Sequence, residues 1–588
     1  MSTLLCVPIM VRDMDEALVD AAEAKRLGAD LVELRIDEVF SGGTQADMEL
    51  EIRRILRLVA ACPLPTIVTC RSAREGGAYD GDESARVSLY ERLGTASGTG
   101  EHPPRYLDFE LESYVASENI RQKINLAVDH PHQTRDLSTS LILSNHDFQQ
   151  RPADLHRRVL RMREQPAARV HKFAFRCRSL RDNLELFEML SQRDTPLIAL
   201  GMGEFGLMSR VLAPKFGGFL TFAALRPAGA TAPGQPTVTE LLELYRFRAI
   251  TPRTKVYGIV GWPVSHSMSP LVHNAQFSRA VYDGVYLPLP IAVAEGASAE
   301  DAFLQFKVTL GSLIDDQRLD FAGCSVTLPH KENLVRLARE RSWTIDPLAD
   351  AIGAANTLVI DREGGTVKIA RVLNTDIEAA VAPLREALCS DSGDPLAGKA
   401  LGVLGAGGVA RAVAAGLARE GARVTIFNRT PSKAQALADE LSRSLSERGL
   451  LPRGGTIVGA ALADACSAVS FAAFINCTPI GMKGGPAPAE SPLDVARLQH
   501  AIAASAGLPG GTSDHTPPLV MDTVYAPIQT PLLLAAKAAG WRTIDGVGMF
   551  ARQAAAQSAA WLGNAGRHPA TVGDIERMVR EKLAGQPA

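Results

Sequence analysis

Eight short apolar runs recur through the first 225 residues of the chain, separated by amphipathic segments such as 15–28 and 180–193. The runs occupy 4–9, 31–36, 66–71, 106–111, 141–145, 170–175, 196–202 and 219–225. Strands that alternate with helices form parallel sheets, which either stay open as doubly wound sheets or close into barrels. The count of eight favours closure, so we predict an α/β fold that begins with a (β/α)8 barrel.

A Pro- and Gly-rich segment, RPAGATAPGQP at 226–236, follows the eighth run and is typical of a loop between domains. One helical segment at 237–247 comes next, and a new strand opens at 256–261. A chain of 588 residues is too long for one hydrophobic core. We therefore predict a barrel domain over 1–236, a linker over 237–253 and a second α/β region from 254 onwards.

The composition is that of a soluble globular protein, with 46% hydrophobic and 22% charged residues and a formal net charge of −3. Acidic and basic residues are interspersed, which argues against nucleic acid or a membrane surface as partner. No apolar stretch is long enough to span a bilayer, and the N-terminal run lacks the basic segment of a signal peptide. Eight scattered cysteines form no CxxC pair, so we expect reduced thiols in a cytoplasmic protein, without a metal site.

Polar side chains gather at the predicted carboxyl ends of the strands in the first half, where functional groups of a barrel lie. These residues are Glu33, Arg35, Arg71, Glu75, His146, Lys172, Arg210 and Gln235. Taken singly, each has a simpler explanation, because a strand lysine often extends to the surface and a loop histidine often only completes a hydrogen bond. Their convergence on one end of a barrel instead predicts a site.

Lys172 lies among apolar residues in VHKFAF, and we expect it to point into the mouth of the barrel. Burial and neighbouring arginines favour the neutral amine of such a lysine, which attacks carbonyl groups to form Schiff bases. His146 is the expected proton carrier near neutral pH, and a carboxylate such as Glu75 can fix its tautomer. The arginines are suited to hold the carboxylate of an anionic substrate.

The first half resembles type I 3-dehydroquinate dehydratases over about 1–236. The matching segments, in order, are ELRID (33–37), TCRSAREGG (69–77), SNHDF (144–148), HKFAF (171–175), MGEFGLMSR (202–210) and ATAPGQ (230–235). The resemblance implies that Lys172 forms an imine with the substrate ketone, that His146 abstracts and returns protons, and that Glu75 orients His146. It also implies a set of substrate-binding residues: Glu33, Arg35, Arg71, Arg210, Gln235 and Thr231, which stands where the family usually has serine.

In the second half, GIVGWPVSHSMSP (258–270) carries Ser267 and Ser269 at a strand-to-helix turn. Closely spaced hydroxyls suit a hydroxylated or carboxylated ligand, although a serine before proline is often only a helix cap. Lys331, in SVTLPHKE, and Asp376, in LNTD, are far apart in the sequence. If the fold pairs them, they can pass a proton to or from a substrate hydroxyl while hydride moves between substrate and nicotinamide.

The segment VLGAGGVAR (403–411) follows a predicted strand and opens a predicted helix. Its residues Gly405, Gly407 and Ala410 match GxGxxA, which allows a tight turn, close approach of a phosphate and packing of the helix. After the next strand, IFNRTPSKA (426–434) offers no carboxylate for the ribose of NAD. Arg429 instead offers a cation for the 2′-phosphate of NADP, so NADP is the predicted cofactor.

The region from about 255 to 588 resembles shikimate dehydrogenases. The matching segments are SHSMSP, SVTLPHK, AANT, LNTD, GAGGVAR, NRT, NCTPIGM, YAP and GVGMFARQ. The resemblance implies catalysis by Lys331 with Asp376, and shikimate binding by Ser267, Ser269, Thr327, Asn356, Asp376, Tyr525 and Gln553. It implies an NADP site formed by Gly405, Ala406, Gly407, Gly408, Val409, Asn428, Arg429, Thr430, Lys433, Thr478 and Gly546.

The same resemblance implies two lobes with the active site between them. The substrate lobe is expected over 254–358, completed by 541–588, and the cofactor lobe over 375–540. The chain departs from the family in three places, with Val372 and Ile377 in place of glycines that flank NTD, and Ala526 in place of the asparagine of YNP.

Together the two halves predict a bifunctional enzyme that converts 3-dehydroquinate to 3-dehydroshikimate and then, with NADPH, to shikimate. One alternative is quinate dehydrogenase activity in the second half, which differs in how the substrate hydroxyls are recognised. Another is a catalytically inactive sensor of pathway metabolites. The sensor predicts eroded catalytic positions, whereas Lys172, His146, Lys331 and Asp376 are all present.

Overall fold

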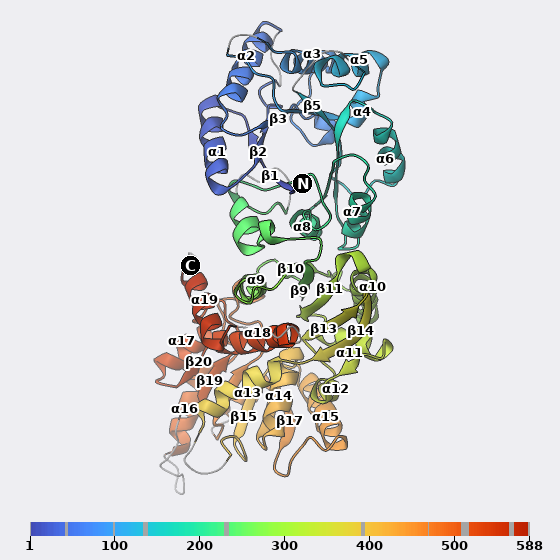
Figure 1. Ribbon diagram of the computed structural model, residues 1–588. Coiled ribbons are helices and arrows are strands. Elements are labelled where there is room, and N and C mark those ends of the chain that lie inside the picture. Colours follow the sequence, from blue (N-terminus) through green and yellow to red (C-terminus); the bar gives the residue numbers. More distant parts are fainter. Residues whose placement is uncertain are drawn as a thin grey trace. The chain divides into compact units, whose positions relative to one another are not determined.

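The computed structural model describes residues 2–40, 45–97, 100–132, 139–227, 234–389, 394–467, 470–506, 517–563 and 570–585. Among the predicted site residues, Thr231 lies outside the described residues. The chain divides into two compact units (Figure 1). The first comprises Met1–Lys255, Asp283–Ile291 and Thr309–Asp320, and the second comprises Val256–Tyr282, Ala292–Val308 and Phe321–Ala588.

Eight parallel strands form the first unit, paired in the order β7-β6-β5-β4-β3-β2-β1-β8. Their bounds are β1 Leu4–Met10, β2 Leu31–Arg35, β3 Thr66–Thr69, β4 Tyr106–Glu110, β5 Ser140–Asp147, β6 Ala168–Arg176, β7 Leu197–Met202 and β8 Leu220–Phe222. The amide of Phe219 donates to the carbonyl of Leu197 at 2.8 Å, which brings the two outer strands together. The nearly closed barrel confirms the predicted fold, and every strand overlaps its predicted run.

Helices surround these strands (Figure 1). They are α1 Met14–Leu27, α2 Gln45–Ala61, α3 Glu83–Gly94, α4 Leu111–Tyr114, α5 Glu118–Ala127, α6 Leu155–Arg163, α7 Asp182–Ser191 and α8 Leu207–Val211, with short 3-10 turns η1 Ala73–Glu75, η2 Glu204–Gly206 and η5 Phe247–Ala249. Helix α1 shows why they start and stop where they do. The Asp13 side chain accepts from the amides of Asp15 and Glu16, and Gly28 ends the helix at φ 99°.

The segment after the eighth strand differs from the predicted helix over 237–247. It forms a five-residue π-helix, η4 Glu240–Leu244. Before it, Thr237 pairs with Ala224, and the amide of Val238 donates to the carbonyl of Ala224 at 3.0 Å. The start of the predicted linker thus continues the hydrogen bonding of the barrel, because these backbone groups are satisfied there rather than by a helix.

Two six-stranded sheets follow, ordered β10-β9-β11-β13-β14-β12 and β17-β16-β15-β18-β19-β20. Strands of the first are β9 Lys255–Gly261, β10 Gly284–Pro290, β11 Phe321–Val326, β12 Thr344–Ile345, β13 Thr357–Glu363 and β14 Thr366–Leu373. Strands of the second are β15 Ala400–Leu404, β16 Arg423–Asn428, β17 Thr456–Ala461, β18 Ala473–Asn476, β19 Leu519–Asp522 and β20 Thr543–Ile544. The second sheet is parallel throughout and has the strand order of dinucleotide-binding folds, as predicted.

The helices of this part are α9 Ser269–Arg279, α10 Ala299–Asp315, α11 Lys331–Glu340, α12 Pro347–Ile352, α13 Asp376–Ala387, α14 Gly408–Arg419, α15 Pro431–Glu447, α16 Val495–Ala506, α17 Pro531–Ala538, α18 Gly546–Leu562 and α19 Val572–Ala584, with η6 Gln317–Leu319 and η7 Leu462–Ser467. Helix α18 packs on the first sheet, where Trp561 Nε1 donates to the carbonyl of Leu358 at 3.0 Å. A C-terminal helix therefore packs with the first of these two sheets.

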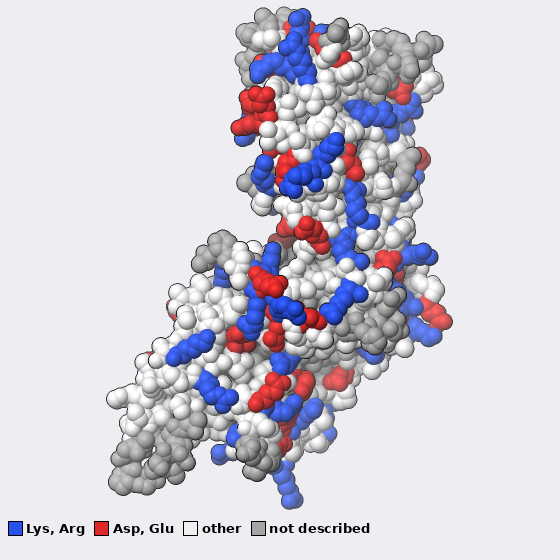
Figure 2. All heavy atoms as spheres, turned by 60° about the vertical axis from the view of Figure 1, so that its left-hand side comes forward, with Lys and Arg blue, Asp and Glu red and all other residues white. Residues whose placement is uncertain are grey.

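None of the described helices combines the length and apolar character needed to cross a membrane. On the face shown in Figure 2, Lys and Arg are mixed with Asp and Glu rather than gathered into one basic area. All eight cysteines are free thiols.

Candidate active sites

A pocket of about 500 Å³, partly open to solvent, lies at the carboxyl ends of the barrel strands. Every described residue that the sequence predicted for the first site lines it: Glu33, Arg35, Arg71, Glu75, His146, Lys172, Arg210 and Gln235. The converging charged and polar side chains suit one small polar ligand. The structure thus brings together side chains from strands that are up to 200 residues apart in the sequence.

The alternation of side chains along the strands explains this gathering. Residues two apart on a strand share a face, so a pocket residue stands directly above a core residue. This spacing relates Leu31 to Glu33 and Val170 to Lys172, which line the pocket. It also relates Ile67 to Thr69 and Ile142 to Ser144, which hydrogen-bond to Glu33 and Asp108. The apolar layer fills the barrel, and the next layer of the same strands forms the site.

Lys172 is buried in the pocket, as predicted, but its nearest charged neighbours are carboxylates rather than arginines. Its Nζ donates to Asp108 Oδ2 at 2.8 Å and lies 3.6 Å from Glu33 Oε1. The ring of Phe222 lies below the amine, with its centroid 4.6 Å from Nζ. The lysine side chain is 6% exposed, so a ligand that reaches Nζ must enter the pocket.

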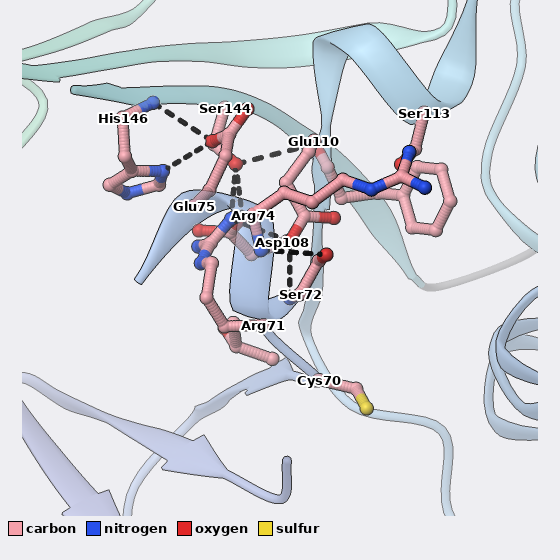
Figure 3. Close-up of polar contacts among 12 residues, drawn as sticks. Cys70, Arg71, Ser72, Arg74, Glu75, Asp108, Glu110, Ser113, Ser144 and His146 are labelled. Carbon is pink, nitrogen blue, oxygen red and sulfur yellow. Dashed lines mark hydrogen bonds and ion pairs between the residues drawn. The ribbon is translucent and has the colours of Figure 1, made fainter. Parts of the chain in front are cut away.

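His146 and Glu75 form a pair at the pocket wall (Figure 3). Glu75 Oε2 lies 3.0 Å from His146 Nδ1 and also accepts from the His146 amide at 2.9 Å. Burial raises the pKa of Glu75 to about 8, against the attraction of Arg71. Burial, with Arg71 and Lys172, lowers the pKa of His146 well below its usual value. The imidazole is therefore neutral at pH 7, and its Nε2 is the nitrogen left for a substrate.

The three arginines of the pocket differ in their partners. Arg35 is paired with Asp37 at 2.9 Å, and Arg71 with Asp108 at 2.7 Å. Arg210 forms no ion pair with any described residue, although its side chain is almost fully buried. Burial lowers the pKa of this guanidinium to about 10, so it still carries its charge at pH 7. A buried cation without a counter-charge is costly, and an anionic ligand group beside Arg210 would compensate that cost.

The sequence reasoning missed Asp108, Glu110 and Ser144, which surround Arg71 (Figure 3). The signal was present in YLDFEL at 106–111, where two carboxylates two residues apart interrupt an apolar strand. Period two places both carboxylates on the face that carries the site.

In the second unit, Lys331 and Asp376 meet as predicted. Lys331 Nζ donates to Asp376 Oδ2 at 2.6 Å, and both side chains are nearly buried. Each residue is the first of its helix, Lys331 of α11 and Asp376 of α13. A carboxylate at a helix N-terminus is favoured by the helix dipole, and here it also holds the amine.

Asn356 fixes the loop that carries Asp376. Its Oδ1 accepts from the Thr375 amide at 2.9 Å, and its Nδ2 donates to Thr375 Oγ1 at 3.0 Å. The Ala355 amide donates to the Lys331 carbonyl at 3.0 Å. The AANT segment therefore ties both members of the Lys331–Asp376 pair to one strand end.

The remaining predicted shikimate contacts lie around the turn before α9. Ser267 Oγ accepts from the Ser269 amide at 3.2 Å, and Ser269 is buried. Tyr525 packs against the apolar cluster that contains Met268, the residue between the two serines, and burial raises the pKa of Tyr525. The amide of Thr327 donates to the carbonyl of Val260 at 2.8 Å, which holds it beside the same strand end.

Helix α18 reaches this site with two glutamines. Gln553, the predicted ligand, is partly exposed. Gln557, one helical turn later, was not predicted; its Nε2 donates to the Asn356 carbonyl at 3.3 Å and to Thr357 Oγ1 at 3.2 Å. At the start of the helix, Gly546 lies so close to the Val524 carbonyl that an added Cβ would be 2.4 Å from the oxygen.

The glycine loop begins at Gly405, which has φ 110° and donates from its amide to the Phe427 carbonyl at 2.7 Å. No described atom lies within 4 Å of the place a Cβ on Gly407 would take, which leaves room for a phosphate. Gly407 precedes α14 without capping it by a side chain, so the first amides of α14 are available to an anion. Ala406 and Val409 pack on the core of this lobe. The loop also faces the Lys331–Asp376 pair, because a Cβ on Gly408 would lie 3.4 Å from Lys331 Cδ.

The residues predicted for the second phosphate follow β16. Asn428 ends the strand, and its Nδ2 donates to the Thr430 carbonyl at 3.1 Å. Thr430 precedes α15, and Lys433 lies in the first turn of that helix. Arg429 and Lys433 are exposed and have no ion-pair partner in the part of the chain that the structure describes. Two unpaired cations at a helix N-terminus fit a phosphate better than a ribose hydroxyl alone.

A buried polar network behind the loop was also missed. Asp522 accepts from Thr530 Oγ1 at 2.7 Å, from the Val524 amide at 2.9 Å and from Asn476 Nδ2 at 3.0 Å. Asn476 Oδ1 accepts from the amide and the hydroxyl of Thr478 at 2.9 and 2.7 Å. Thr478 Cγ2 would lie 3.0 Å from a Cβ added to Gly405, so the network fixes one wall of the glycine loop.

Comparison with known proteins finds family matches in both halves of the chain. The model for type I 3-dehydroquinase matches residues 5–252, that for the shikimate dehydrogenase substrate binding domain 259–358, and that for shikimate/quinate 5-dehydrogenase 387–453. The bifunctional 3-dehydroquinate dehydratase/shikimate dehydrogenase, chloroplastic, of Arabidopsis thaliana is 35% identical over 571 residues, 95% of this chain and 82% of the relative. The chain belongs to this bifunctional dehydratase/dehydrogenase family.

One further relative matches about half of the chain, and one solved structure matches nearly all of it. A shikimate dehydrogenase (NADP(+)) of Methanocella arvoryzae is 37% identical over 331 residues, 56% of this chain and 99% of the relative. The solved structure of dehydroquinate dehydratase and shikimate dehydrogenase from S. pombe is 22% identical, with a TM-score of 0.37, and the match covers 99% of this chain and 98% of that chain.

The departures of this bifunctional chain from the usual glycines fit the local packing. Val372 is a buried strand residue opposite Leu358. Ile377 occupies space left by Gly416, whose added Cβ would lie 2.9 Å from the isoleucine side chain. Asn374 Oδ1 still accepts from the Asp376 amide at 3.0 Å, so the NTD turn keeps its hydrogen bond.

Proposed function

We propose that this protein dehydrates 3-dehydroquinate to 3-dehydroshikimate in its barrel and reduces that product to shikimate with NADPH in its second unit. The observation that carries the proposal is the pairing of two complete sites in one chain. The barrel pocket combines an amine, a neutral imidazole and an unpaired guanidinium, and the second unit pairs Lys331 with Asp376 beside a glycine loop.

In the barrel, we assign to Arg210 the substrate carboxylate, since among the described residues that line the pocket it is the buried cation without an acidic partner. Lys172 Nζ then attacks the substrate ketone, and loss of water leaves a protonated imine that draws electrons from the neighbouring carbon. His146 Nε2 takes the proton from that carbon and later returns it to the departing hydroxyl. Glu75 fixes the tautomer of His146 through Nδ1, and Glu33, Arg35, Arg71, Thr231 and Gln235 are assigned to substrate binding.

In the second unit, we assign proton transfer to Lys331 with Asp376, and shikimate binding to the residues that surround them: Ser267, Ser269, Thr327, Asn356, Tyr525 and Gln553. The amine gives a proton to the carbonyl oxygen that becomes the new hydroxyl, and Asp376 holds the amine in place. The cofactor, when bound, supplies the hydride. The open space at Gly407, the uncapped α14 and the unpaired Arg429 and Lys433 fit NADP, the cofactor named for the Methanocella relative.

The proposed domains are a dehydratase barrel over 1–236, a linker over 237–253, a shikimate lobe over 254–358 completed by 541–588, and a cofactor lobe over 375–540. We also propose a cytoplasmic location, supported by eight free cysteines. The proposed partners are small molecules only.

A coupled assay tests the function directly. The full chain is given 3-dehydroquinate and NADPH, and we expect NADPH oxidation together with formation of shikimate. Borohydride added with 3-dehydroquinate should trap an adduct on Lys172. An adduct on another residue contradicts the imine assignment, and a preference for quinate with NAD contradicts the assignment of the second unit.

A further inference from the structure

Asp108 is a buried carboxylate that contacts the pocket lysine Lys172, although no role has yet been given to it. It lies on β4 with its side chain 1% exposed. Lys172 Nζ donates to Oδ2 at 2.8 Å. On the other oxygen, Oδ1 accepts from Arg71 Nη2 at 2.7 Å and from Ser144 Oγ at 2.6 Å. Oδ2 thus contacts the amine of Lys172, whereas Oδ1 is held by side chains of the neighbouring strands.

Glu33 is the other carboxylate near the amine, but its geometry is different. Its Oε1 accepts from Thr69 Oγ1 at 2.7 Å and lies 3.6 Å from Lys172 Nζ, beyond hydrogen-bond distance. Asp108 is therefore the carboxylate that contacts Nζ directly. Because Arg71 and Ser144 hold its Oδ1, Oδ2 cannot turn away when a ligand enters.

We propose that Asp108 is a further catalytic residue of the dehydratase, the counter-ion that holds Lys172 Nζ and stabilises the protonated imine formed on it. The proposal rests on the proposed imine at Lys172. In that step an ammonium and a ketone give an iminium and one water. The C–N bond forms, the carbonyl C–O bond breaks, and the protons lost by the amine leave in the water, so one N–H and one positive charge remain on Nζ.

Lys172 Nζ therefore carries a positive charge both before the step, as an ammonium, and after it, as an iminium, and the same counter-ion serves both states. A fixed carboxylate placed where positive charge persists stabilises it without reorganisation, which is the usual electrostatic contribution of an enzyme. Asp108 also remains ionised in this site, because Arg71 and Lys172 hold its pKa well below the usual range although burial acts the other way. It is an acceptor throughout and does not compete with His146 for the substrate proton.

The test compares Asp108→Asn with Asp129→Asn in the full chain. Asp129 is a matched control, since it is paired with Arg169 on the barrel exterior at 2.9 Å and does not reach the pocket. To monitor imine formation, each variant is mixed with 3-dehydroquinate and quenched with borohydride at increasing times. The fraction of chain that carries the adduct on Lys172 is then measured by mass spectrometry. We expect Asp108→Asn to slow trapping by about 10- to 100-fold, the value of one hydrogen bond to a charged group, and Asp129→Asn to match wild type.

Two further measurements separate chemistry from folding. Hydrogen exchange in β4, β5 and β6 reports whether Asp108→Asn keeps the barrel, and reduction of 3-dehydroshikimate by the same chain reports on the second unit. If Asp108→Asn loses the barrel, Asp108→Ala is assayed with and without formate. A rise of at least fivefold in the trapping rate of Asp108→Ala on addition of formate supports the counter-ion role, because a small carboxylate replaces the charge and not the packing. A smaller rise overturns that role.

The outcomes distinguish the two proposals. If wild type forms no adduct on Lys172, the proposed imine fails, and the role of Asp108 fails with it. If wild type is trapped and a folded Asp108→Asn is trapped within threefold of the same rate, the imine stands and the counter-ion role is wrong.

Discussion

Lys331 Nζ donates to Asp376 Oδ2 at 2.6 Å across 45 residues of sequence, from the start of one helix to the start of another. The contact is nearly buried, so either partner without the other would be an uncompensated charge. Strand pairing creates it: β11 delivers Lys331, β14 delivers Asp376, and β13 lies between these two strands. A contact of this kind is a consequence of sheet order and cannot be read from either motif alone.

Replacing Lys331 by Met should abolish reduction of 3-dehydroshikimate and leave dehydration unchanged. The substitution keeps the unbranched side chain and removes the proton donor, and positioned acid–base groups contribute about 10²- to 10⁴-fold to rate. The measurement is NADPH oxidation with 3-dehydroshikimate, beside dehydration of 3-dehydroquinate by the same sample. Lys307→Met is the control, since Lys307 forms an exposed ion pair with Glu340. A variant that keeps more than a tenth of the reductase rate contradicts the assignment of Lys331.

Arg210→Met should raise the stability of the ligand-free barrel while it lowers affinity for substrate. Burial lowers the pKa of Arg210 to about 10 from 12.5, so the charged group destabilises the folded barrel at pH 7, on the order of 3 kcal/mol. Methionine fills much of the same volume without the charge. We expect a higher Tm without ligand and a KM for 3-dehydroquinate raised by about tenfold or more.

Arg163→Met provides the comparison for Arg210, because Arg163 lies on the outer helix α6 and is partly exposed. It should change neither Tm nor KM appreciably. If Arg210→Met lowers Tm instead, the guanidinium has a stabilising partner, and its role as an unpaired receptor for the substrate carboxylate is wrong.

Asp522 should make the cofactor lobe less stable as the pH rises from about 4 to about 6. Burial raises its pKa to about 6, above the ordinary 3.8, against the hydrogen bonds from Thr530, Val524 and Asn476. Between these pH values the folded state holds a proton that the unfolded state has lost. The stabilising contribution is thus complete below 3.8 and is lost as the pH rises through 6, with an upper limit of about 3 kcal/mol.

Asp522→Asn removes this titration, so its stability should depend less on pH in the same window. The measurement is hydrogen exchange of β18 and β19, corrected for the intrinsic exchange rate at each pH. Asp494→Asn, an exposed position of the same lobe, should keep the slope of wild type. Equal slopes in wild type and Asp522→Asn would show that the protonation of Asp522 does not couple to folding.

The sequence predicted the architecture well because period-two runs and amphipathic helices repeat throughout the chain. It also predicted the residues that line the barrel pocket, since strand ends converge in a barrel. What it could not predict is which of these residues pair with one another. The sequence does not distinguish Arg35, Arg71 and Arg210 from one another. In the fold, the first two form ion pairs with carboxylates, whereas Arg210 forms none with any described residue.

Supporting residues were the other gap. Asp108 and Asp522 lie inside apolar strands and belong to no motif used for prediction, but both accept several hydrogen bonds in the folded chain. The lysine environment was anticipated in part: Lys172 is buried, as expected, but beside Asp108 and Glu33 rather than beside arginines. Such partners depend on strand register, which a single sequence does not specify.

Replacing Arg429 by Asp should weaken NADP far more than NAD. Arg429 is exposed, unpaired among the described residues and placed at the end of β16, where an acidic residue would accept from the ribose of NAD. A charge-assisted bond to phosphate is worth about 1.5 to 3 kcal/mol, so KM for NADPH should rise by about 10- to 100-fold. The new carboxylate repels the 2′-phosphate but can accept from the ribose hydroxyl, so KM for NADH should stay level or fall. Arg443→Asp, at an exposed site further along α15, controls for the change of charge. Equal losses with both cofactors would mean that Arg429 does not read the 2′-phosphate, and the assignment of NADP would then depend on Lys433 and Thr430 alone.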